Sequence, residues 1–283
     1  MTSDKKSAAL LAEILVLKGL QYIVISPGSR NAPIIISFAG NPNIKALSIV
    51  DERSAAFFAL GIAQQTRKPV AIACTSGTAA LNYAPAIAEA YYQKVPLLVL
   101  TADRPADLID QGEGQTIRQK NIYKNYIKGS FEIPEDFKNE TEFTSAVSII
   151  NKAINLSCFP DYGPVHINLP FSEPIYNSVK VHNWKAQNIH PRVRLFDMKE
   201  EEVKNFAKSW NKYSKKLLIA GMMDPNIAVS RLISKIVDDP SVVLLSENTS
   251  NLQGCCSVNC IDNVVSAILP DEVEAFKPEL LVT

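Results

Sequence analysis

The sequence has no excess of charge of either sign and few of the residues that build metal sites. Lysine plus arginine and aspartate plus glutamate each number 29 in 283 residues, so the formal net charge is zero. This balance argues against a general nucleic-acid binder, although it leaves room for a local basic site. The three histidines follow no metal-ligand pattern, and the five cysteines are odd in number and lack zinc-type spacing. We therefore expect a reducing, cytoplasmic setting.

Long apolar runs are also missing. No stretch approaches the roughly 20 apolar residues that a membrane helix needs, so we predict no membrane span. The N-terminal segment is apolar in part, but Glu13 and Lys18 interrupt it, and we predict an amphipathic helix over about residues 4–19 rather than a signal peptide. Hydrophobic residues make up 47% of the chain and charged residues 20%, which is typical of a folded globular protein of about two domains.

The sequence does contain a regular alternation of short apolar strands and helices. The strands are expected at Tyr22–Ile25, Ile44–Val50, Pro69–Thr75, Pro96–Thr101 and Val165–Asn168. Strands that are apolar throughout and separated by helices predict an α/β fold with a parallel sheet covered on both faces. Residues 170–197 carry three prolines without periodicity, which indicates a linker, and a second α/β pattern runs from Lys199 to about Phe276. The last six residues resemble the opening of a buried strand, which suggests a fragment.

Ligands of an open parallel sheet bind beyond the carboxyl ends of its strands, so the loops there are the candidate sites. The loop Ser26–Asn31 contains Gly28 for an unusual backbone angle, Ser29 or Asn31 as a helix cap, and Arg30. Its amides and Arg30 suit an anion, whereas the plainer interpretation is a capped turn with a solvated arginine.

The second loop, Asp51–Ser54, opens a helix. Acidic residues in a first helical turn commonly complement the helix dipole, and this accounts for Glu52 without any function. The apolar residues that follow allow a sharper hypothesis, in which the Glu52 carboxyl has a raised pKa and donates a proton.

Two further loops follow strands. Ser76-Gly77-Thr78 is a turn of small residues that suits close approach of a ligand, and Cys74 before it is better explained as a buried thiol than as a nucleophile. Asp103-Arg104 could form a surface salt bridge. However, Arg30, Arg104 and Arg118 share one rim of the predicted sheet, which favours a substrate with several carboxylates. Near the end of the chain, Cys255, Cys256 and Cys260 lack a suitably spaced fourth ligand, so we predict no metal there.

Taken in order, these segments resemble a known family. They are SPGSRNAP at 26–33, DERSAAFFALGIA at 51–63, CTSGTAALNYAPAIAEAYY at 74–92, LTADRP at 100–105, GQTIRQ at 114–119 and GPVHINLPFSEPIY at 163–176. The family is MenD, the thiamine-diphosphate-dependent 2-succinyl-5-enolpyruvyl-6-hydroxy-3-cyclohexene-1-carboxylate synthases of menaquinone biosynthesis. The resemblance is dense over about residues 20–176 and loose over 198–283.

The resemblance implies an architecture and a reaction. Residues 1–180 would be the pyrimidine-binding domain, 181–197 a linker and 198–283 an incomplete central domain. The domain that holds the diphosphate and Mg²⁺ would be absent, so this chain alone is expected to be inactive. The family reaction decarboxylates 2-oxoglutarate and adds the resulting carbanion to isochorismate in a 1,4 sense. The active site forms between subunits of a homo-oligomer, a dimer or a tetramer, and we expect an apolar partner face that promotes self-association.

The resemblance also implies residue roles. Glu52 falls on the family's cofactor-activating glutamate, which hydrogen-bonds N1′ of the aminopyrimidine. Ser76, Gly77 and Thr78 would line the cofactor or substrate pocket. Ser29, Arg30, Arg104 and Gln115 fall on substrate-contacting positions, and Arg118 matches the motif as well. Gly114 departs from the family pattern, which usually has Asn at that position, so a polar contact to substrate is lost there.

Three alternatives remain open from the sequence. The first is another thiamine-diphosphate 2-oxoacid decarboxylase or carboligase, which the Ser-Arg and Asp-Arg-Pro loops disfavour. The second is a non-catalytic module that pairs with a separate subunit. The third is an α/β protein that binds some anionic metabolite at the same loops, although this reading does not predict a glutamate at the centre of the site.

Overall fold

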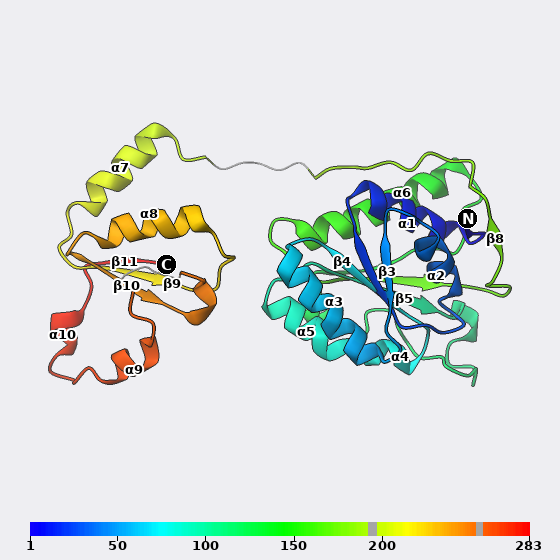
Figure 1. Cartoon of the computed structure of the whole chain (residues 1–283), viewed down its shortest axis with the longest axis horizontal. Coiled ribbons are helices and arrows are strands. Elements are labelled where there is room, and N and C mark those ends of the chain that lie inside the picture. The colour runs from blue at the N-terminus through cyan, green and yellow to red at the C-terminus, as the bar shows by residue number, and fades with distance from the viewer. Residues whose placement is uncertain (192–196, 253–256) are drawn as a thin grey trace. The chain divides into compact units, whose positions relative to one another are not determined.

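The structure is a computed structural model that describes residues 1–191, 197–252 and 257–283 of the chain. The chain divides into two compact units, Met1–Val193 and Arg194–Thr283, and each is described separately (Figure 1). Residues 181–191, the described part of the predicted linker, lie against the first unit. There the Nε1–H group of Trp184 donates to Glu13 Oε2 at 2.9 Å, and Asn151 Nδ2 donates to the carbonyl of Gln187 at 2.9 Å.

The first unit is built on a six-stranded sheet with all strands parallel. Its strand order is β3-β2-β4-β5-β7-β6. The strands are β2 (Tyr22–Ile25), β3 (Lys45–Ser48), β4 (Val70–Cys74), β5 (Leu97–Asp103), β6 (Gly129–Glu132) and β7 (Val165–Pro170). The predicted α/β class is thus confirmed. A small antiparallel pair, β1 (Thr2–Ser3) with β8 (Ser178–Val179), joins the N-terminus to the segment after β7.

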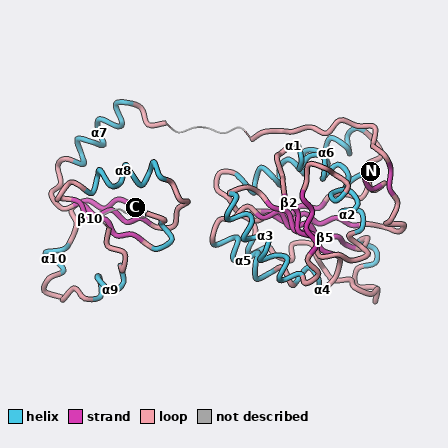
Figure 2. The backbone as a smooth tube through the Cα atoms, viewed as in Figure 1, coloured by secondary structure: helices cyan, strands magenta, loops and turns pink. Residues whose placement is uncertain are grey.

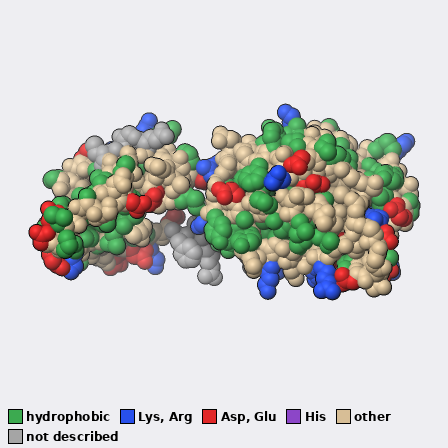
Figure 3. Space-filling model, turned by 90° about the horizontal axis from the view of Figure 1, so that it is seen from below, with side chains coloured by type: hydrophobic (Ala, Val, Ile, Leu, Met, Phe, Trp, Pro, Cys, Tyr) green, Lys and Arg blue, Asp and Glu red, His purple; other side chains and the backbone are tan. Residues whose placement is uncertain are grey.

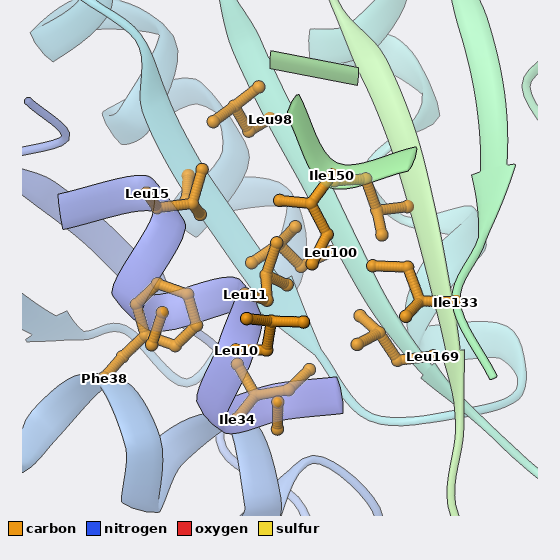
Figure 4. Close-up of a cluster of buried hydrophobic side chains, with 14 of the residues drawn as sticks. Leu10, Leu11, Leu15, Ile34, Phe38, Leu98, Leu100, Ile133, Ile150 and Leu169 are labelled. Atoms are coloured by element: carbon orange, nitrogen blue, oxygen red, sulfur yellow. The ribbon is translucent and has the colours of Figure 1, made fainter. Parts of the chain in front are cut away.

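Helices cover both faces of this sheet, and each face has its own apolar core. One face is covered by α1 (Lys6–Leu17), α2 (Ala32–Ala39) and α6 (Glu140–Cys158), whose side chains meet Leu98 and Leu100 of β5 (Figure 4). The other face is covered by α3 (Glu52–Thr66), α4 (Thr78–Leu81) and α5 (Ala84–Tyr92). Because successive strand residues point to opposite faces, a strand buried on both sides is apolar at most positions, as β4 and the first half of β5 are.

The helix ends follow from local chemistry. The first helix ends at Leu17 because Gly19 takes a φ of +82°, and the N–H of Leu20 bonds back to the carbonyl of Leu15 at 2.9 Å. The third helix begins after Asp51, whose carboxylate accepts the N–H of Ser54 at 2.7 Å.

Three features differ from the expected pattern. The sequence predicts a helical stretch from about Thr78 to Tyr92, and the structure divides it into two helices, α4 and α5, with Pro85 in the first turn of the second one. The sequence pattern did not reveal β6, which is only partly buried at the edge of the sheet. Gly28 does not have a positive φ, so its predicted special backbone angle is wrong.

The second unit contains a three-stranded parallel sheet in the order β10-β9-β11 (Figure 2). Its strands are β9 (Lys216–Ala220), β10 (Val242–Ser246) and β11 (Leu280–Val282), and its helices are α7 (Glu200–Trp210), α8 (Ile227–Val237), α9 (Ile261–Ser266) and α10 (Val273–Phe276). Leu218, Leu244 and Ile233 form part of its small core. The strand expected near the end of the chain is β11.

Within the described ranges, no helix combines the length and the apolar composition of a bilayer-spanning segment.

Candidate functional site

The loops singled out from the sequence gather at the carboxyl edge of the first sheet. The strand order reverses at β2, since β3 lies on one side of it and β4 on the other. The helices that follow β2 and β4 also cover opposite faces, because α2 packs in one core and α4 in the other. This arrangement is a topological switch point, the usual ligand-binding position of an open parallel sheet.

The loop after β2 closes on itself through Asn31. The Asn31 side chain accepts the N–H of Gly28 and donates to the carbonyl of Ser26, both at 2.9 Å. Asn31 occupies the N-cap position of α2, but its side chain makes no hydrogen bond to the helix, so it organises the loop rather than capping the helix as predicted. Gly28 is required for close approach, since a Cβ there would lie 2.6 Å from Cβ of Thr75 in the loop after β4.

Arg30 is buried rather than solvated, with 6% of its surface exposed. Its guanidinium donates to the carbonyl of Phe171 at 2.9 Å and pairs with Glu173 at 3.0 Å, while its Nε–H has no partner in the described structure. A buried guanidinium with one unused donor can still receive an anion. Ser29, next to it, is exposed.

Glu52 is the first residue of α3 and is half-buried. Within the described residues its carboxylate has no hydrogen bond or ion pair, whereas the neighbouring Asp51 carboxylate caps the helix. The hydrogen bond from the Ser54 N–H holds the pKa of Asp51 below its ordinary value. The two adjacent carboxylates therefore have different tasks, and Glu52 is the one left free for a ligand.

The electrostatics connect Glu52 with the end of β4. Burial raises the pKa of the Cys74 thiol well above its ordinary value, and the negative charge of Glu52 raises it further. Cys74 is fully buried and remains protonated, so the interpretation of it as a structural thiol is confirmed.

The turn after Cys74 contains a buried hydroxyl and a glycine with a positive φ. Ser76 is 1% exposed, and its Oγ has no partner in the described structure. Gly77 has a φ of +84°, and a Cβ there would lie 3.0 Å from the carbonyl carbon and oxygen of Gln115. This turn and the loop that carries Gln115 are therefore in direct contact. Thr78 is exposed at the start of α4.

Arg104 connects the end of β5 with the same loop. Its guanidinium donates to the carbonyl of Gly114 at 3.1 Å and lies 3.6 Å from Glu113, while its buried Nε–H has no partner among the described residues. The alternative of a surface Asp103–Arg104 salt bridge is wrong, because Asp103 is 2% exposed and accepts the main-chain N–H of Arg104 at 2.8 Å.

The two other predicted site residues of this loop, Gln115 and Arg118, face solvent. Gln115 is exposed and has a φ of +53°. Arg118 is also exposed, and its Nε–H donates to Asp110 Oδ2 at 2.8 Å.

Buried polar residues that the sequence did not single out lie behind these loops. Gln119 is fully buried, and its Oε1 accepts the N–H of Gly77 at 2.8 Å. Its Nε2 donates to Asn168 Oδ1 at 3.0 Å, and Asn168 Nδ2 in turn donates to Asp103 Oδ2 at 2.8 Å. Burial raises the pKa of Asp103 to about 6, against the lowering effect of the Asn168 hydrogen bond, and the charge of Glu132 adds to the rise. The sequence signal that could have pointed to these buried polar residues is a polar residue within a mainly apolar strand, such as Asn168 in β7.

No cluster of metal-ligating side chains occurs within residues 1–191, 197–252 and 257–283. Of the three cysteines near the end of the chain, Cys255 and Cys256 lie outside the described residues, and Cys260 is exposed.

Comparison with known proteins identifies the class first. Residues 5–122 match the family described as the thiamine pyrophosphate enzyme, N-terminal TPP binding domain. The match covers β2 to β5 and the loops described above. Residues 5–122 of this chain are therefore similar to the N-terminal domain that this family description names.

Curated proteins of similar sequence carry one enzyme name. Three proteins named 2-succinyl-5-enolpyruvyl-6-hydroxy-3-cyclohexene-1-carboxylate synthase are similar over nearly the whole chain. The protein of Flavobacterium psychrophilum is 43% identical over 98% of this chain, that of Christiangramia forsetii 41% over 98%, and that of Porphyromonas gingivalis 39% over 99%. The alignments cover 49%, 51% and 48% of these relatives, so the chain spans about half of their length. The family resemblance seen in the motifs is confirmed.

Proposed function

We propose that this chain supplies the pyrimidine-binding part of the active site of a 2-succinyl-5-enolpyruvyl-6-hydroxy-3-cyclohexene-1-carboxylate synthase. The reaction would decarboxylate 2-oxoglutarate and add the resulting carbanion to isochorismate in a 1,4 sense. The observation that carries the proposal is the placement of Glu52, the half-buried first residue of α3, whose carboxylate has no partner among the described residues. Its charge acts on Cys74 at the buried end of β4. Ser76 and Gly77 follow directly after that strand end.

The residues at this edge fit the cofactor, thiamine diphosphate. The buried Ser76 hydroxyl and the Glu52 carboxylate have no partners among the described residues, and the lack of a side chain at Gly77 lets its turn meet the loop that carries Gln115. When bound, the cofactor supplies a thiazolium ring that accepts the electron pair released on decarboxylation. Ser76, Gly77 and Thr78 would hold it, and Glu52 would hold a proton at N1′ of its aminopyrimidine.

The polar residues around this edge suit dicarboxylate substrates. Arg30 and Arg104 each have a buried Nε–H without a partner among the described residues, and guanidinium binds carboxylate through two parallel hydrogen bonds. Ser29, Gln115 and Arg118 are exposed on the same loops and would contribute further contacts to substrate. Gly114 offers no side chain, and its carbonyl accepts hydrogen bonds from the Arg104 guanidinium and the Thr116 hydroxyl.

Other parts of the proposal concern groups outside this unit. We propose that Mg²⁺ and the cofactor diphosphate are held by residues outside this chain, which spans about half of its relatives. We also propose a cytoplasmic homo-oligomer, a dimer or a tetramer. The exposed apolar side chains of α3, α4, α5 and the 3₁₀ turn Lys124–Tyr126 support such an interface; they are Phe57, Phe58, Leu81, Tyr91, Tyr92 and Tyr126. Hydrophobic side chains gather on the face shown in Figure 3.

The first test is product formation by the protein expressed from its complete reading frame. The protein receives isochorismate, 2-oxoglutarate, Mg²⁺ and thiamine diphosphate, and the adduct is detected by mass spectrometry. We expect Glu52→Gln to lower kcat about 10²–10⁴-fold, because general acid–base catalysis contributes about this much. Asp51→Asn is the matched control: it removes the neighbouring carboxylate but keeps a cap oxygen for the Ser54 N–H, so kcat should stay within about threefold.

The outcomes separate the candidate functions. No adduct from a folded, cofactor-bound parent would exclude the synthase, and decarboxylation of another 2-oxoacid would favour a different carboligase. Equal activity in the parent and Glu52→Gln would remove Glu52 from the mechanism.

A further inference from the structure

The side chain of Gln119 makes hydrogen bonds to three elements of the first unit: the turn after β4, strand β5 and strand β7. It is fully buried, and all its hydrogen-bonding groups face the protein. Its Oε1 accepts the N–H of Gly77 in the turn after β4. Its Nε2 donates to the carbonyl of Ala102 in β5 and to Asn168 Oδ1 in β7, both at 3.0 Å. One amide therefore fixes the turn after β4 to two neighbouring strands.

The anchor of this amide is itself fixed. Asn168 is 2% exposed, and its Oδ1 accepts a second hydrogen bond from the Thr101 hydroxyl at 2.7 Å. Its Nδ2 donates to Asp103 Oδ2 at 2.8 Å. A rotation of the Asn168 amide by 180° would place its NH₂ group against two donors, so the network permits only one orientation.

The far end of the network is neutral. Burial lowers the pKa of His166 to about 3, so the ring carries no charge near neutral pH. His166 Nε2 lies 2.7 Å from the Thr101 hydroxyl. Since that hydroxyl gives its proton to Asn168, the His166 Nε2–H donates to it. Each side chain of this hydrogen-bond network, from His166 through Thr101 and Asn168 to Gln119, thus has a hydrogen-bond partner, which makes the network rigid.

The near end of the network faces the proposed site. The Gly77 backbone has a φ of +84°, which glycine adopts readily, and it lies against the backbone of Gln115. Gln119 belongs to the same loop as Gln115, four residues further on, so its bond to Gly77 closes the loop against the turn. Without an acceptor at Gln119, the buried N–H of Gly77 would be left unpaired, and this loss favours opening of the turn.

We propose that Gln119 is a positioning residue of the active site. It holds the turn Ser76-Gly77-Thr78 and the loop that carries Gln115 in one fixed arrangement, so that cofactor-contacting and substrate-contacting groups meet. This proposal rests on the proposed function for the roles of Ser76–Thr78 and Gln115. The contact between the two loops stands without it.

The first experiment uses the 283-residue chain and hydrogen–deuterium exchange. Gln119→Met keeps the length of the side chain but removes the acceptor and both donors. We expect the Gly77 amide to exchange at least tenfold faster than in the parent, together with faster exchange in the peptide that covers residues 112–118. Gln111→Met is the matched control, because Gln111 is exposed in the same region and its side chain makes no hydrogen bond in the described structure. Unchanged exchange at Gly77 in folded Gln119→Met overturns the proposal.

A second variant guards against misfolding. Gln119→Asn keeps the amide but shortens the side chain by one carbon, so it cannot reach Gly77 and Asn168 together. If Gln119→Met does not fold, the same exchange comparison is made with Gln119→Asn, with the same expected and overturning results.

The second experiment measures kcat and KM for 2-oxoglutarate in the protein from the complete reading frame, well below the Tm of each variant. We expect kcat/KM to fall at least tenfold in Gln119→Met and to stay within twofold in Gln111→Met. In Gln119→Glu, activity should recover as the pH falls, because a protonated carboxyl regains one donor. Faster exchange at Gly77 with unchanged kcat/KM overturns the positioning role. A parent without activity refutes the proposed function instead, and the exchange result then decides whether Gln119 holds the two loops together.

Discussion

Replacing Gly77 by alanine should destabilise the first unit through two separate effects. The residue has a φ of +84° and a ψ of −146°, a region of backbone space that is nearly restricted to glycine. An alanine there would also place its Cβ 3.0 Å from the carbonyl carbon and oxygen of Gln115. The obstructing atoms belong to the backbone, so no side chain can rotate away to relieve the contact.

The magnitude follows from these two effects. The dihedral strain costs about 1–3 kcal/mol, and forcing an extra methyl against fixed atoms costs about 1–3 kcal/mol more. We therefore expect Gly77→Ala to lower the free energy of unfolding by about 2–6 kcal/mol. Two controls separate the effects, since a Cβ on Gly112 or Gly61 would meet nothing within 4 Å. Gly112 has a φ of +78°, so Gly112→Ala carries the strain alone and should cost about 1–2 kcal/mol. Gly61 lies inside α3, where alanine should stabilise by about 0.5–1 kcal/mol.

Urea unfolding can be made specific for the first unit. The chain has two tryptophans, Trp184 in the first unit and Trp210 in the second. In a Trp210→Phe background, the fluorescence of Trp184 reports on the unfolding of Met1–Val193. A Gly77→Ala variant as stable as its parent would refute the reasoning, because the turn could then relax away from Gln115 without cost. Equal losses for Gly77→Ala and Gly112→Ala would refute only the steric part.

Two further predictions concern charge and surface. The pKa of Asp103 is raised to about 6 in the folded chain from 3.8, so the folded state holds this proton more tightly than the unfolded state. The group's stabilising contribution is therefore present below about pH 4 and is lost as the pH rises through about 6, by about 3 kcal/mol. Asn does not titrate, so urea unfolding of the parent and Asp103→Asn at pH 4 and pH 7 should show their stability difference shifting by about this amount, and a constant difference would contradict it. Phe58→Glu should weaken self-association of the chain in sedimentation velocity, because Phe58 is 51% exposed on the apolar face, whereas Val181→Glu, at a site 75% exposed elsewhere, should not. Association that is identical in the two variants would argue against this face as the interface.

The sheet could be predicted from the sequence because its central strands are buried on both faces. β4 and β5 are apolar at nearly every position, since each face of the sheet has its own core of helices. Such runs stand out from the amphipathic helices between them. The edge strand β6 gave no such signal, because it is only partly buried and its sequence, GSFE, is half polar.

The candidate site was predictable as a set of loops but not as a set of contacts. The position of each loop follows from the rule that ligands bind at the carboxyl ends of parallel strands. Two features of a single loop were misjudged: Gly28 serves close approach to Thr75 rather than an unusual φ, and Asn31 bonds within its own loop. Both depend on a neighbour that a local pattern cannot reveal.

The contacts between loops depend on residues that are distant in sequence. Gln119 reaches Gly77, 42 positions away, and Asn168, 49 positions away. A glutamine at the end of a motif has no periodicity or spacing that marks it as buried, and glutamine is usually exposed. Only the fold shows that β5 lies between β4 and β7, so that one side chain beneath the loops can bond to both neighbours.

The contacts between the loops and the buried amides behind them explain how a site made of loop residues keeps one geometry at the edge of a sheet. Gly28 allows the loop after β2 to touch Thr75, and Gly77 allows the turn after β4 to touch Gln115. The two glycines allow the loops to approach one another, but they provide no side-chain hydrogen bonds that would hold the loops in place. The hydrogen bonds come from the buried side-chain amides of Gln119 and Asn168, which link the turn after β4 to strands β5 and β7. Exposed side chains such as Thr78 and Gln115 can then face a ligand, because buried residues that do not contact the ligand hold the backbone of these loops in place.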